Sequence, residues 1–560
     1  MNAYYPNNMA LLTNREDKEP TDSGKGMRTS SPTATMDISP PPPIDCHSRP
    51  QAAQVEWNDD PRNPHNWPVV RKYTVTILFS AFSFNTLVTS TMVAPALSQI
   101  RKDLNIPTDA ETQLVLSIYV LAYAVGYFLW APLSEVYGRK PILQAANVWF
   151  CVWNLVCGFS KNEATITVAR FFSGCGAASS LALGTGTMGE IWRPTQRERS
   201  LAVLSTLTLL GPCIGPIFGG VTAQWSLDSW RWSFWSTSMF NALLQLIAFR
   251  FLHESHAPTI LRLRGESEDQ LGKRSKPGKA SCTTVEVLIL ALKRPWYIIV
   301  TQPASQGLVI YTGLSFGCLY IVLTVIPLAF TEIYGQSLAM ASLHYVSFAV
   351  GTTVAAQTCA PMIDYLYQRK ARQYVDQVAL SADVDEALRA KSLNHKAPPE
   401  LRLFPFIPTI LLIICGLLLF GWSLHYRKHW IVPDIGIAMF GAGSQAMTQC
   451  TNAYVIDVFS EIKSPSPTED QANRQTTLSI NWSASAMASI WATKSLGGFA
   501  FPLFAVDLIR RLGWGWTATL LAILNLSVGL PVAVLLLVHG QKLREMGRKR
   551  IEARMEEGKM

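Results

Sequence analysis

The chain has 560 residues, of which 49% are hydrophobic and only 16% charged, and its formal net charge is +9 at pH 7. A soluble protein would carry charge on about a quarter of its residues, so this composition excludes an ordinary soluble domain. Apolar runs of about 20 residues, long enough to cross the hydrocarbon core of a bilayer, recur along the sequence. We therefore predict an all-α, multi-pass membrane protein.

The first 68 residues differ in composition from the rest of the chain. They are rich in serine, threonine, proline and charged residues, and include four consecutive prolines at 40–43. Such a segment cannot bury a hydrophobic core. We expect residues 1–68 to form a disordered cytoplasmic tail.

The apolar runs that follow predict twelve transmembrane helices. Their expected bounds are 70–96, 112–131, 141–159, 165–188, 200–222, 231–252, 305–330, 338–360, 405–425, 431–453, 482–506 and 516–538. A polar, basic loop at 255–304 divides them into two six-helix bundles, 69–254 and 305–540. An internally repeated transporter has this organisation, with a binding cavity where the two halves meet.

The second predicted bundle contains two polar insertions, at 361–404 and 458–481, to which the sequence assigns no function. A basic tail at 541–560 follows the last span. Most of the 48 lysines and arginines fall in the segments that are cytoplasmic if both termini lie inside the cell. The positive charge is therefore interpreted as a topology signal in a lipid bilayer, and nothing indicates nucleic acid as a partner.

A short loop after the second span, within APLSEVYGRKP (131–141), is the first candidate functional motif. Glu135 can accept hydrogen bonds from a neighbouring helix end, and Gly138 permits a tight turn. Arg139 and Lys140 hold the loop on the cytoplasmic side. The loop is predicted to act as a hinge between spans that rock; the alternative is a plain positively charged turn.

Two cations are predicted inside the membrane. Arg170 lies in RFFSG of the fourth span, and Lys494 lies in the eleventh. A charge in hydrocarbon is costly and usually faces a polar cavity or a partner, which favours a functional role for Arg170. The alternative for either residue, and the stronger one for Lys494, is burial between helices near the membrane surface, with the long side chain reaching toward that surface.

The fifth span contains LLGPCIGPIFGG, from Leu209 to Gly220. Its notable residues are Gly211, Pro212, Gly215, Pro216, Gly219 and Gly220. Glycines four residues apart share a helix face and let two helices approach backbone to backbone. Neighbouring helices can satisfy the carbonyls that the prolines leave free. A generic kinked helix contact is the alternative to a specialised transport motif.

No acidic residue falls in the middle of a predicted span, so the sequence points to no proton-carrying carboxylate. Polar and aromatic residues that could line a cavity are Asn85, Tyr119, Tyr123, Tyr311, Tyr320, Gln445 and Asn452. Each could equally be a helix contact. The cysteine and histidine spacings predict neither disulfides nor a metal site, and no cofactor motif is present. Sequons at Asn481 and Asn525 fall at an inner span end and within a span, where we expect no glycosylation.

In this order, the motifs resemble the major facilitator superfamily, and more closely its fungal twelve-span drug:proton antiporters. The resemblance extends from about residue 57 to 547. It rests on DDPRNPHNW (59–67), LSEVYGRK (133–140), RFFSG (170–174), GPCIGPIFGG (211–220), WRWSFW (230–235), HESHAPTILRLR (253–264), PELRLFPFIP (399–408) and GGFAFPLFA (497–505).

The resemblance implies a monomeric antiporter without a cofactor, which exports a small amphipathic molecule in exchange for protons by alternating access. The cargo would be a xenobiotic or a fungal secondary metabolite, and the lack of mid-span carboxylates favours a neutral or anionic one. The plasma membrane is the expected location, with the vacuolar or peroxisomal membrane as alternatives. A transporter of polyamines or other small metabolites and a transport-dead receptor or scaffold are competing functions. An enzyme is the least favoured, because no catalytic constellation appears.

Overall fold

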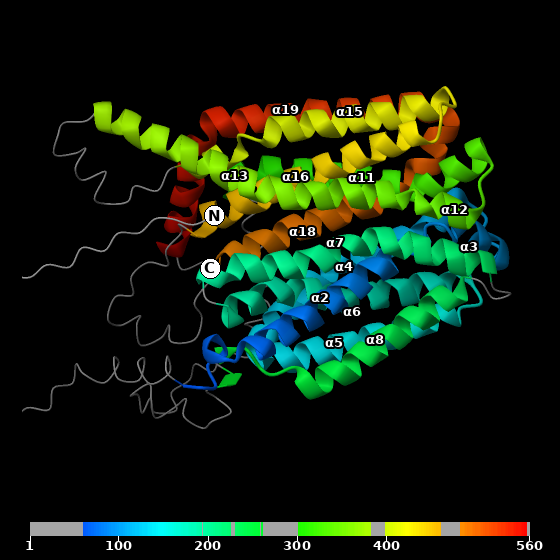
Figure 1. The fold of residues 1–560 in the computed structure, drawn as a ribbon, viewed down its shortest axis with the longest axis horizontal. Helices are drawn as coiled ribbons and strands as arrows, with labels where there is room; N and C mark the ends of the chain where they lie inside the picture. Colours follow the sequence, from blue (N-terminus) through cyan, green and yellow to red (C-terminus); the bar gives the residue numbers. More distant parts are fainter. Residues whose placement is uncertain are drawn as a thin grey trace, which may run out of the picture. The chain divides into compact units, whose positions relative to one another are not determined.

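The computed structural model describes residues 60–192, 194–225, 230–257, 259–260, 301–381, 398–460 and 482–556. Within these ranges the regular secondary structure is helical (Figure 1). Residues 1–59 of the predicted tail (1–68), most of the central loop and most of the insertion at 458–481 lie outside the described residues. The last part of that tail is ordered, since Pro64–Asn66 form a short helix and Trp67 is buried.

Twelve helices in this part of the chain have 19 residues or more. The first half contains α2 (Val69–Thr91), α4 (Asp109–Tyr137), α5 (Arg139–Gly158), α6 (Glu163–Ile191), α7 (Pro194–Trp225) and α8 (Arg231–Phe251). The second half contains α11 (Pro303–Tyr334), α13 (Tyr345–Ser381), α15 (Phe406–His425), α16 (Ile431–Ser460), α18 (Trp482–Ala500) and α19 (Ala505–Glu556). The short helices are η1 (Pro64–Asn66), α3 (Leu97–Asp103), α12 (Leu338–Leu343), η2 (Pro399–Leu403) and η3 (Pro502–Phe504).

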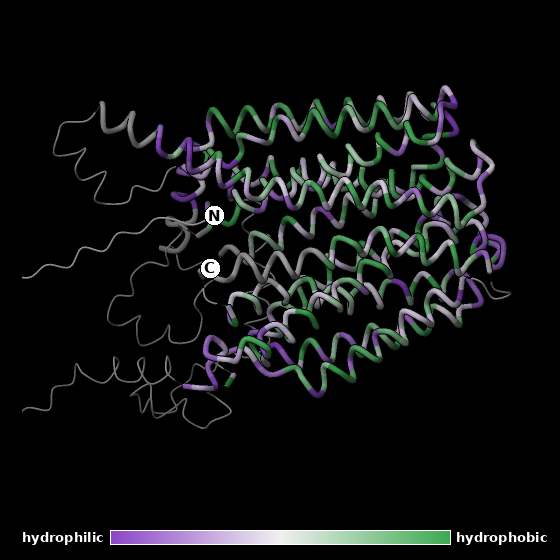
Figure 2. The backbone as a smooth tube through the Cα atoms, in the orientation of Figure 1, coloured by the Kyte–Doolittle hydropathy of each residue, from purple (hydrophilic) through white to green (hydrophobic). Residues whose placement is uncertain are grey.

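Eight stretches of the described residues are long and apolar enough to cross a membrane, and one of them, Ala486–Arg550, runs from α18 into α19. Three further long helices, α2, α8 and α16, do not reach that hydropathy. In α2 the serine and threonine hydroxyls donate to backbone carbonyls four residues earlier, as in Thr76 to Lys72 (2.9 Å) and Ser80 to Thr76 (2.8 Å). Figure 2 shows hydrophobic residues along the helices and hydrophilic ones near their ends. Polar residues are thus accommodated where their groups are satisfied inside the protein.

Local sequence signals fix several helix ends. A capping box begins α4, where Thr108 accepts from the Glu111 amide at 3.2 Å and Glu111 accepts from the Thr108 amide at 3.1 Å. The prediction for the first span ran to residue 96, but α2 ends at Thr91. Pro95 explains this, since proline has no amide hydrogen and clashes with the carbonyl four residues earlier. At the end of α11, Gly335 adopts a left-handed conformation (φ 63°).

The largest differences from the predicted bounds occur in the second half. The expected span at 338–360 is short α12 followed by α13, which continues as helix to Ser381, into the predicted insertion at 361–404. Pro502 begins a 3₁₀ turn after α18, which therefore ends at Ala500 rather than near residue 506. Gly513 breaks α19 (φ 76°), and the helix then runs through the predicted basic tail to Glu556.

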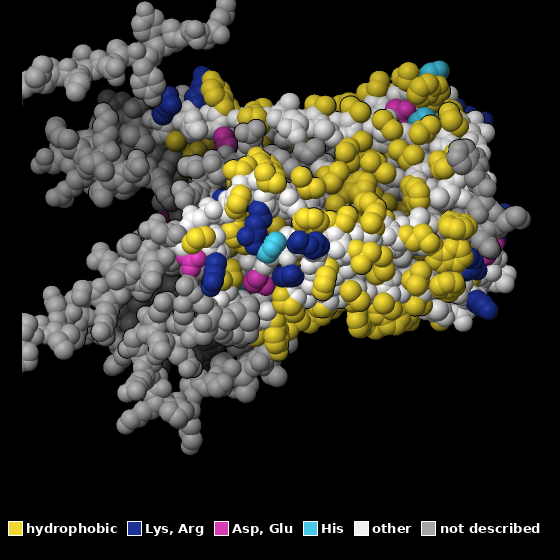
Figure 3. All heavy atoms as spheres, turned by 60° about the horizontal axis from the view of Figure 1, so that its bottom comes forward, with side chains coloured by type: hydrophobic (Ala, Val, Ile, Leu, Met, Phe, Trp, Pro, Cys, Tyr) yellow, Lys and Arg dark blue, Asp and Glu magenta, His cyan; other side chains and the backbone are white. Residues whose placement is uncertain are grey.

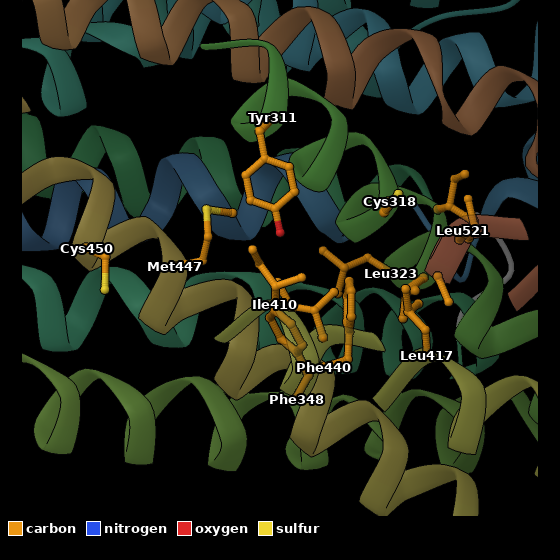
Figure 4. Packing of buried hydrophobic residues seen from close by; sticks show 14 of the residues in the cluster. Tyr311, Cys318, Leu323, Phe348, Ile410, Leu417, Phe440, Met447, Cys450 and Leu521 are labelled. Atoms are coloured by element: carbon orange, nitrogen blue, oxygen red, sulfur yellow. The ribbon is translucent and has the colours of Figure 1, made fainter. Parts of the chain in front are cut away.

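The helices of each half pack mainly among themselves. Close pairs are α4 with α6 and α2 with α7 in the first half, and α15 with both α16 and α19 in the second. Figure 4 shows the core of the second half, where aliphatic and aromatic side chains from several helices meet. Between the halves, α4 packs against α18, and α7 packs against α12 and α13. These last contacts form what we call the interhalf interface.

Candidate functional site

The turn between α4 and α5 is built around Gly138. Its φ of 98° lies in the region that favours glycine. A Cβ atom at this position would lie 2.6 Å from Oε2 of Glu254 and 3.1 Å from Cγ2 of Thr259. Glycine is therefore required both by the backbone conformation and by the close approach of the segment after α8.

Glu254 is the acceptor that holds this turn. Its carboxylate accepts from the amides of Arg139 (2.8 Å) and Lys140 (3.1 Å), which are the first two residues of α5. The first amides of a helix have no partner within it and attract negative charge. The amide of His256 also donates to Glu254, at 3.0 Å. The carboxylate thus ties the start of α5 to the end of α8.

The side chain of Arg139 pairs with Glu190, at 3.0 Å, near the end of α6. Ser255 donates to the other oxygen of Glu190, at 2.8 Å. Glu135, which we predicted as the acceptor of this loop, is exposed and forms no hydrogen bond among the described residues. Glu190 and Glu254 occupy the role instead, so the loop joins three helices at what we call the Arg139 end of the molecule.

The second half has a comparable cluster near the same end. Arg402 of η2 donates to Asp364 of α13 at 2.9 Å and to Asp457 of α16. Arg544 of α19 lies 3.4 Å from Glu400, also of η2. Asp364 and Asp457 are thus part of ion pairs that join η2 to α13 and α16.

The glycines of α7 face two different neighbours. A Cβ atom on Gly211 would lie 2.7 Å from Cβ of Leu87, and one on Gly215 would lie 2.6 Å from the Val88 carbonyl oxygen. A Cβ on Gly219 would collide with the carbonyl oxygen of Met92, so these three glycines let α7 lie directly on α2.

Gly220 points the other way, toward Ser342 of α12 in the second half. Pro212 and Pro216 lie inside α7, which continues as a helix past both. The motif therefore contributes to packing within the first half and also to the interhalf interface.

Arg170 is completely buried, and each nitrogen of its guanidinium group donates to a backbone carbonyl. It donates to Thr89 (2.9 Å), Ser90 (3.4 Å) and Val115 (3.2 Å). Thr89 and Ser90 are near the end of α2, where helix carbonyls lack an amide partner in the helix. A cation also complements the negative end of the helix dipole. The geometry is that of a C-terminal cap for α2.

An aromatic row leads from Arg170 to the second half. The guanidinium carbon lies 4.2 Å from the ring centre of Tyr119. Ring centres are then 5.2 Å apart for Tyr119 and Tyr123, 6.5 Å for Tyr123 and Tyr127, and 5.9 Å for Tyr127 and Trp491. The Tyr127 and Trp491 rings stack at 29° across the interhalf interface. We call Tyr119, Tyr123, Tyr127 and Trp491 the aromatic row.

Lys494 lies at the far end of this row. Its side chain is 1% exposed, and its Nζ atom has no hydrogen-bond partner among the described residues. Nζ lies 4.7 Å from the ring centre of Trp491. Lys494 therefore differs from Arg170 in its hydrogen bonding, although both are buried cations.

The other predicted cavity residues do not all join this group. Tyr320 does, since its hydroxyl lies 3.1 Å from that of Ser90 across the interface. Asn85 donates to the Thr237 carbonyl of α8, at 3.4 Å, and is a contact within the first half. Tyr311 points into the apolar core of the second half (Figure 4). Gln445 and Asn452 are half-buried on α16, and Oδ1 of the Asn452 side chain has no hydrogen-bond partner in the described part of the chain.

The halves are also joined at the end opposite Arg139, which we call the Asp109 end. Asp109, at the start of α4, pairs with Arg101 of the same half and with Arg510 of α19. The Ala339 amide of α12 donates to Gln224 of α7 at 3.0 Å. Sequence reasoning missed these contacts, as it missed Trp491 and Tyr127. The described residues contain no cluster of three histidine, cysteine or acidic side chains that could hold a metal ion.

Two bundles of six long helices that meet along a polar and aromatic interface define a membrane transporter fold, and the comparisons with known proteins agree. The model of the Major Facilitator Superfamily matches residues 77–468, and the chain belongs to this family.

Its relatives are fungal transporters. The chain is 34% identical to an uncharacterized transporter of Schizosaccharomyces pombe, over 88% of this chain and 93% of that one. It is 32% identical to the efflux pump vrtL of Penicillium aethiopicum (93% and 95%). It is 34% identical to the probable efflux pump mfs2 of Aspergillus flavus (81% and 98%).

Solved structures support the fold. A partially occluded inward-open structure of the xylose transporter XylE from E. coli aligns with a TM-score of 0.53 and 14% identity, covering 83% of this chain and 97% of that one. An inward-facing bacterial homolog of the human lysosomal transporter Spinster aligns with a TM-score of 0.53 and 12% identity (86% and 94%). The chain is thus a multi-pass membrane transporter of the major facilitator type, not an enzyme.

Proposed function

We propose that this protein is a proton-coupled antiporter that exports a small amphipathic molecule, a xenobiotic or a fungal secondary metabolite, by alternating access. The proton gradient supplies the energy, no cofactor takes part, and a monomer in the bilayer is the functional unit. The observation that carries the proposal is the interhalf interface, where α4 and α7 of the first half meet α18, α12 and α13 of the second and which is closed at the Asp109 end. The names of two relatives, an efflux pump and a probable efflux pump, support the direction of transport.

The location of contacts along the interface supports rocking of the halves. Asp109 and Arg510 pair at one end, and Tyr127 and Trp491 stack further along. The ion pairs of Arg139 and Arg402, in contrast, each join helices of a single half. Such pairs can move with their half as a rigid body, while a contact such as Asp109 with Arg510 must break when the Asp109 end opens.

Charge sets the orientation that we propose. Lysines and arginines are concentrated at the Arg139 end and in the segments that adjoin it, so this end faces the cytoplasm, as do both termini. Figure 3 shows that charged side chains lie toward the ends and hydrophobic ones cover the middle of the face in view. The plasma membrane is the proposed location, with the vacuolar or peroxisomal membrane as alternatives.

The test is uptake into inside-out membrane vesicles, where export appears as accumulation. Vesicles with and without the protein receive an imposed proton gradient, acidic inside, and a panel of hydrophobic toxins, fungal metabolites and spermine. We expect accumulation of at least one hydrophobic compound, and its loss when a protonophore collapses the gradient. Accumulation of spermine alone would replace the proposal with polyamine transport. Folded protein that moves nothing would favour a receptor or scaffold and contradict the proposal.

A further inference from the structure

The unpartnered ammonium of Lys494 has no role in the rocking of the two halves. We propose that Lys494 is the counter-ion for an acidic group on the cargo, so that the exported molecules join a carboxylate or phenolate to an aromatic body. This inference rests on the proposed function and narrows its substrate class.

An unpaired charge is costly to bury. Moving an ammonium from water into a protein interior is strongly unfavourable unless hydrogen bonds or an opposite charge compensate. Three lysine or arginine side chains are buried in the described part of the chain: Lys72, Arg170 and Lys494. Lys72 donates to the His65 carbonyl at 2.9 Å and Arg170 donates to three carbonyls, but the Lys494 ammonium has only the face of Trp491. The group is left ready for a partner that comes from outside the chain.

The helix register places Lys494 on the surface where cargo would bind. Residues three before and four after it, Trp491 and Gly498, lie on the same face of α18. Trp491 stacks on Tyr127 of α4. A Cβ atom on Gly498 would lie 3.0 Å from Cγ1 of Val120, also of α4, and 3.2 Å from ring atoms of Phe316 and Tyr320 of α11. Lys494 therefore lies on the face of α18 that meets the first half. Separation of the halves would expose this face.

The surroundings select the sign of the cargo charge. The described acidic side chains of the long helices lie near helix ends or, as for Asp364 and Glu545, outside the predicted spans 338–360 and 516–538. Arg170, in contrast, adds a second cation beyond the aromatic row. A cationic cargo would meet like charge with no carboxylate to receive it. A neutral cargo would leave the ammonium unpaired. An anionic cargo avoids the like-charge repulsion and also pairs with the ammonium. A charge-assisted hydrogen bond of this kind is among the stronger polar contacts.

The aromatic row indicates what the acidic group is attached to. Tyr127 and Trp491 present flat aromatic rings with apolar faces. Each ring has only one hydrogen-bonding group, at its edge. When the halves separate, each ring loses its stacking partner. A planar aromatic body can replace that partner, since offset stacking favours such a contact.

The experiment uses one aromatic body with three charges: anthracene-9-carboxylate, anthracene-9-carboxamide and 9-(aminomethyl)anthracene. Binding to the purified full-length protein in detergent is followed by the fluorescence of the ligand. We expect the acid to bind wild type at least about tenfold more tightly than the amide, and the amine to bind weakest. Lys494→Arg should keep the preference, and Lys494→Met should bind acid and amide equally. The matched control, Lys161→Met, removes an exposed lysine and should behave as wild type.

Three results would overturn the inference: no saturable binding of the acid, equal binding of acid and amide to wild type, or an acid preference that survives in Lys494→Met. The last would show that the ammonium is a structural or proton-carrying group. The proposed function fails by a different observation, the absence of protonophore-sensitive uptake in vesicles. Suppose that wild-type vesicles accumulate a neutral or cationic compound while the purified protein shows no preference for the acid. The proposed transport function would then stand, and only the inference of an acidic cargo would be rejected.

Discussion

Arg170 in the first half and Lys494 in the second are both buried cations, one at each end of the aromatic row, but their surroundings are opposite. Arg170 donates three hydrogen bonds to carbonyls, two of them near the end of α2. Lys494 donates none within the described chain. Charge alone therefore does not mark a functional residue in a membrane. The informative property is whether the fold already satisfies it.

Removal of Arg170 should have the largest effect. Arg170→Met leaves the Thr89 and Ser90 carbonyls buried without their donor, and unsatisfied buried groups cost about 1–3 kcal/mol each. We expect a lower free energy of unfolding by about 3 kcal/mol and little monodisperse protein, measured by thermal unfolding in detergent. Arg170→Lys, which keeps the charge but fewer donors, should recover part of the loss. Full stability of Arg170→Met would mean that Arg170 is not a structural cap, and would contradict its contrast with Lys494.

Removal of the Lys494 charge should change the free energy of unfolding in the opposite direction. Lys494→Met replaces an unpaired buried charge with an apolar chain of similar length, so the protein without cargo should gain stability of about 1 kcal/mol. The same thermal unfolding measurement serves, with Lys161→Met as the matched control on an exposed site. A loss of stability as large as that of Arg170→Met would mean that Lys494 is also structural.

A smaller effect is expected for Trp491, whose ring lies between Lys494 and the first half. Trp491→Leu removes both the stack on Tyr127 and the cation–π contact to Lys494. Such contacts contribute about 0.5–1.5 kcal/mol, so affinity for anthracene-9-carboxylate should fall about fivefold. Trp149→Leu, on a partly exposed tryptophan of α5, is the control and should not change affinity. Unchanged binding in Trp491→Leu would separate the aromatic row from the cargo.

The smallest effect is expected at the Asp109 end. The Arg510 side chain is 62% exposed, and exposed ion pairs contribute roughly 0–1 kcal/mol. Arg510→Gln should leave stability nearly unchanged but speed hydrogen exchange in the amides near Asp109, followed by mass spectrometry. Arg511→Gln, on the adjacent exposed arginine, is the control. Equal exchange in both variants would mean that this pair does not help to close the interface that buries Lys494.

The fold could be predicted from the sequence because bilayer thickness and helix geometry fix how long an apolar segment must be to cross the membrane. Apolar run length predicted the twelve helices, and errors arose where proline or a continuing helix moved an end, as at Thr91 and Ser381. Glycine spacing predicted a close helix contact for α7, and the structure identifies α2 as the neighbour.

The candidate site was less accessible to sequence reasoning, because its contacts join residues far apart in the chain. Glu254 lies more than a hundred residues from the Arg139 amide that it accepts from. Burial of Lys494 could be predicted, but the lack of a hydrogen-bond partner depends on every helix around it. Trp491 lies three residues before Lys494, a spacing that could have indicated a shared helix face.

The most direct test of the account is transport of the matched acid and amide by proteoliposomes that contain wild type, Lys494→Arg or Lys494→Met. Exchange of internal for external anthracene-9-carboxylate requires binding and movement but no assigned proton site. We expect wild type and Lys494→Arg to exchange the acid much faster than the amide, and Lys494→Met to lose this difference while remaining folded. Exchange of the acid by Lys494→Met at the wild-type rate would contradict the role of Lys494 as the cargo's counter-ion.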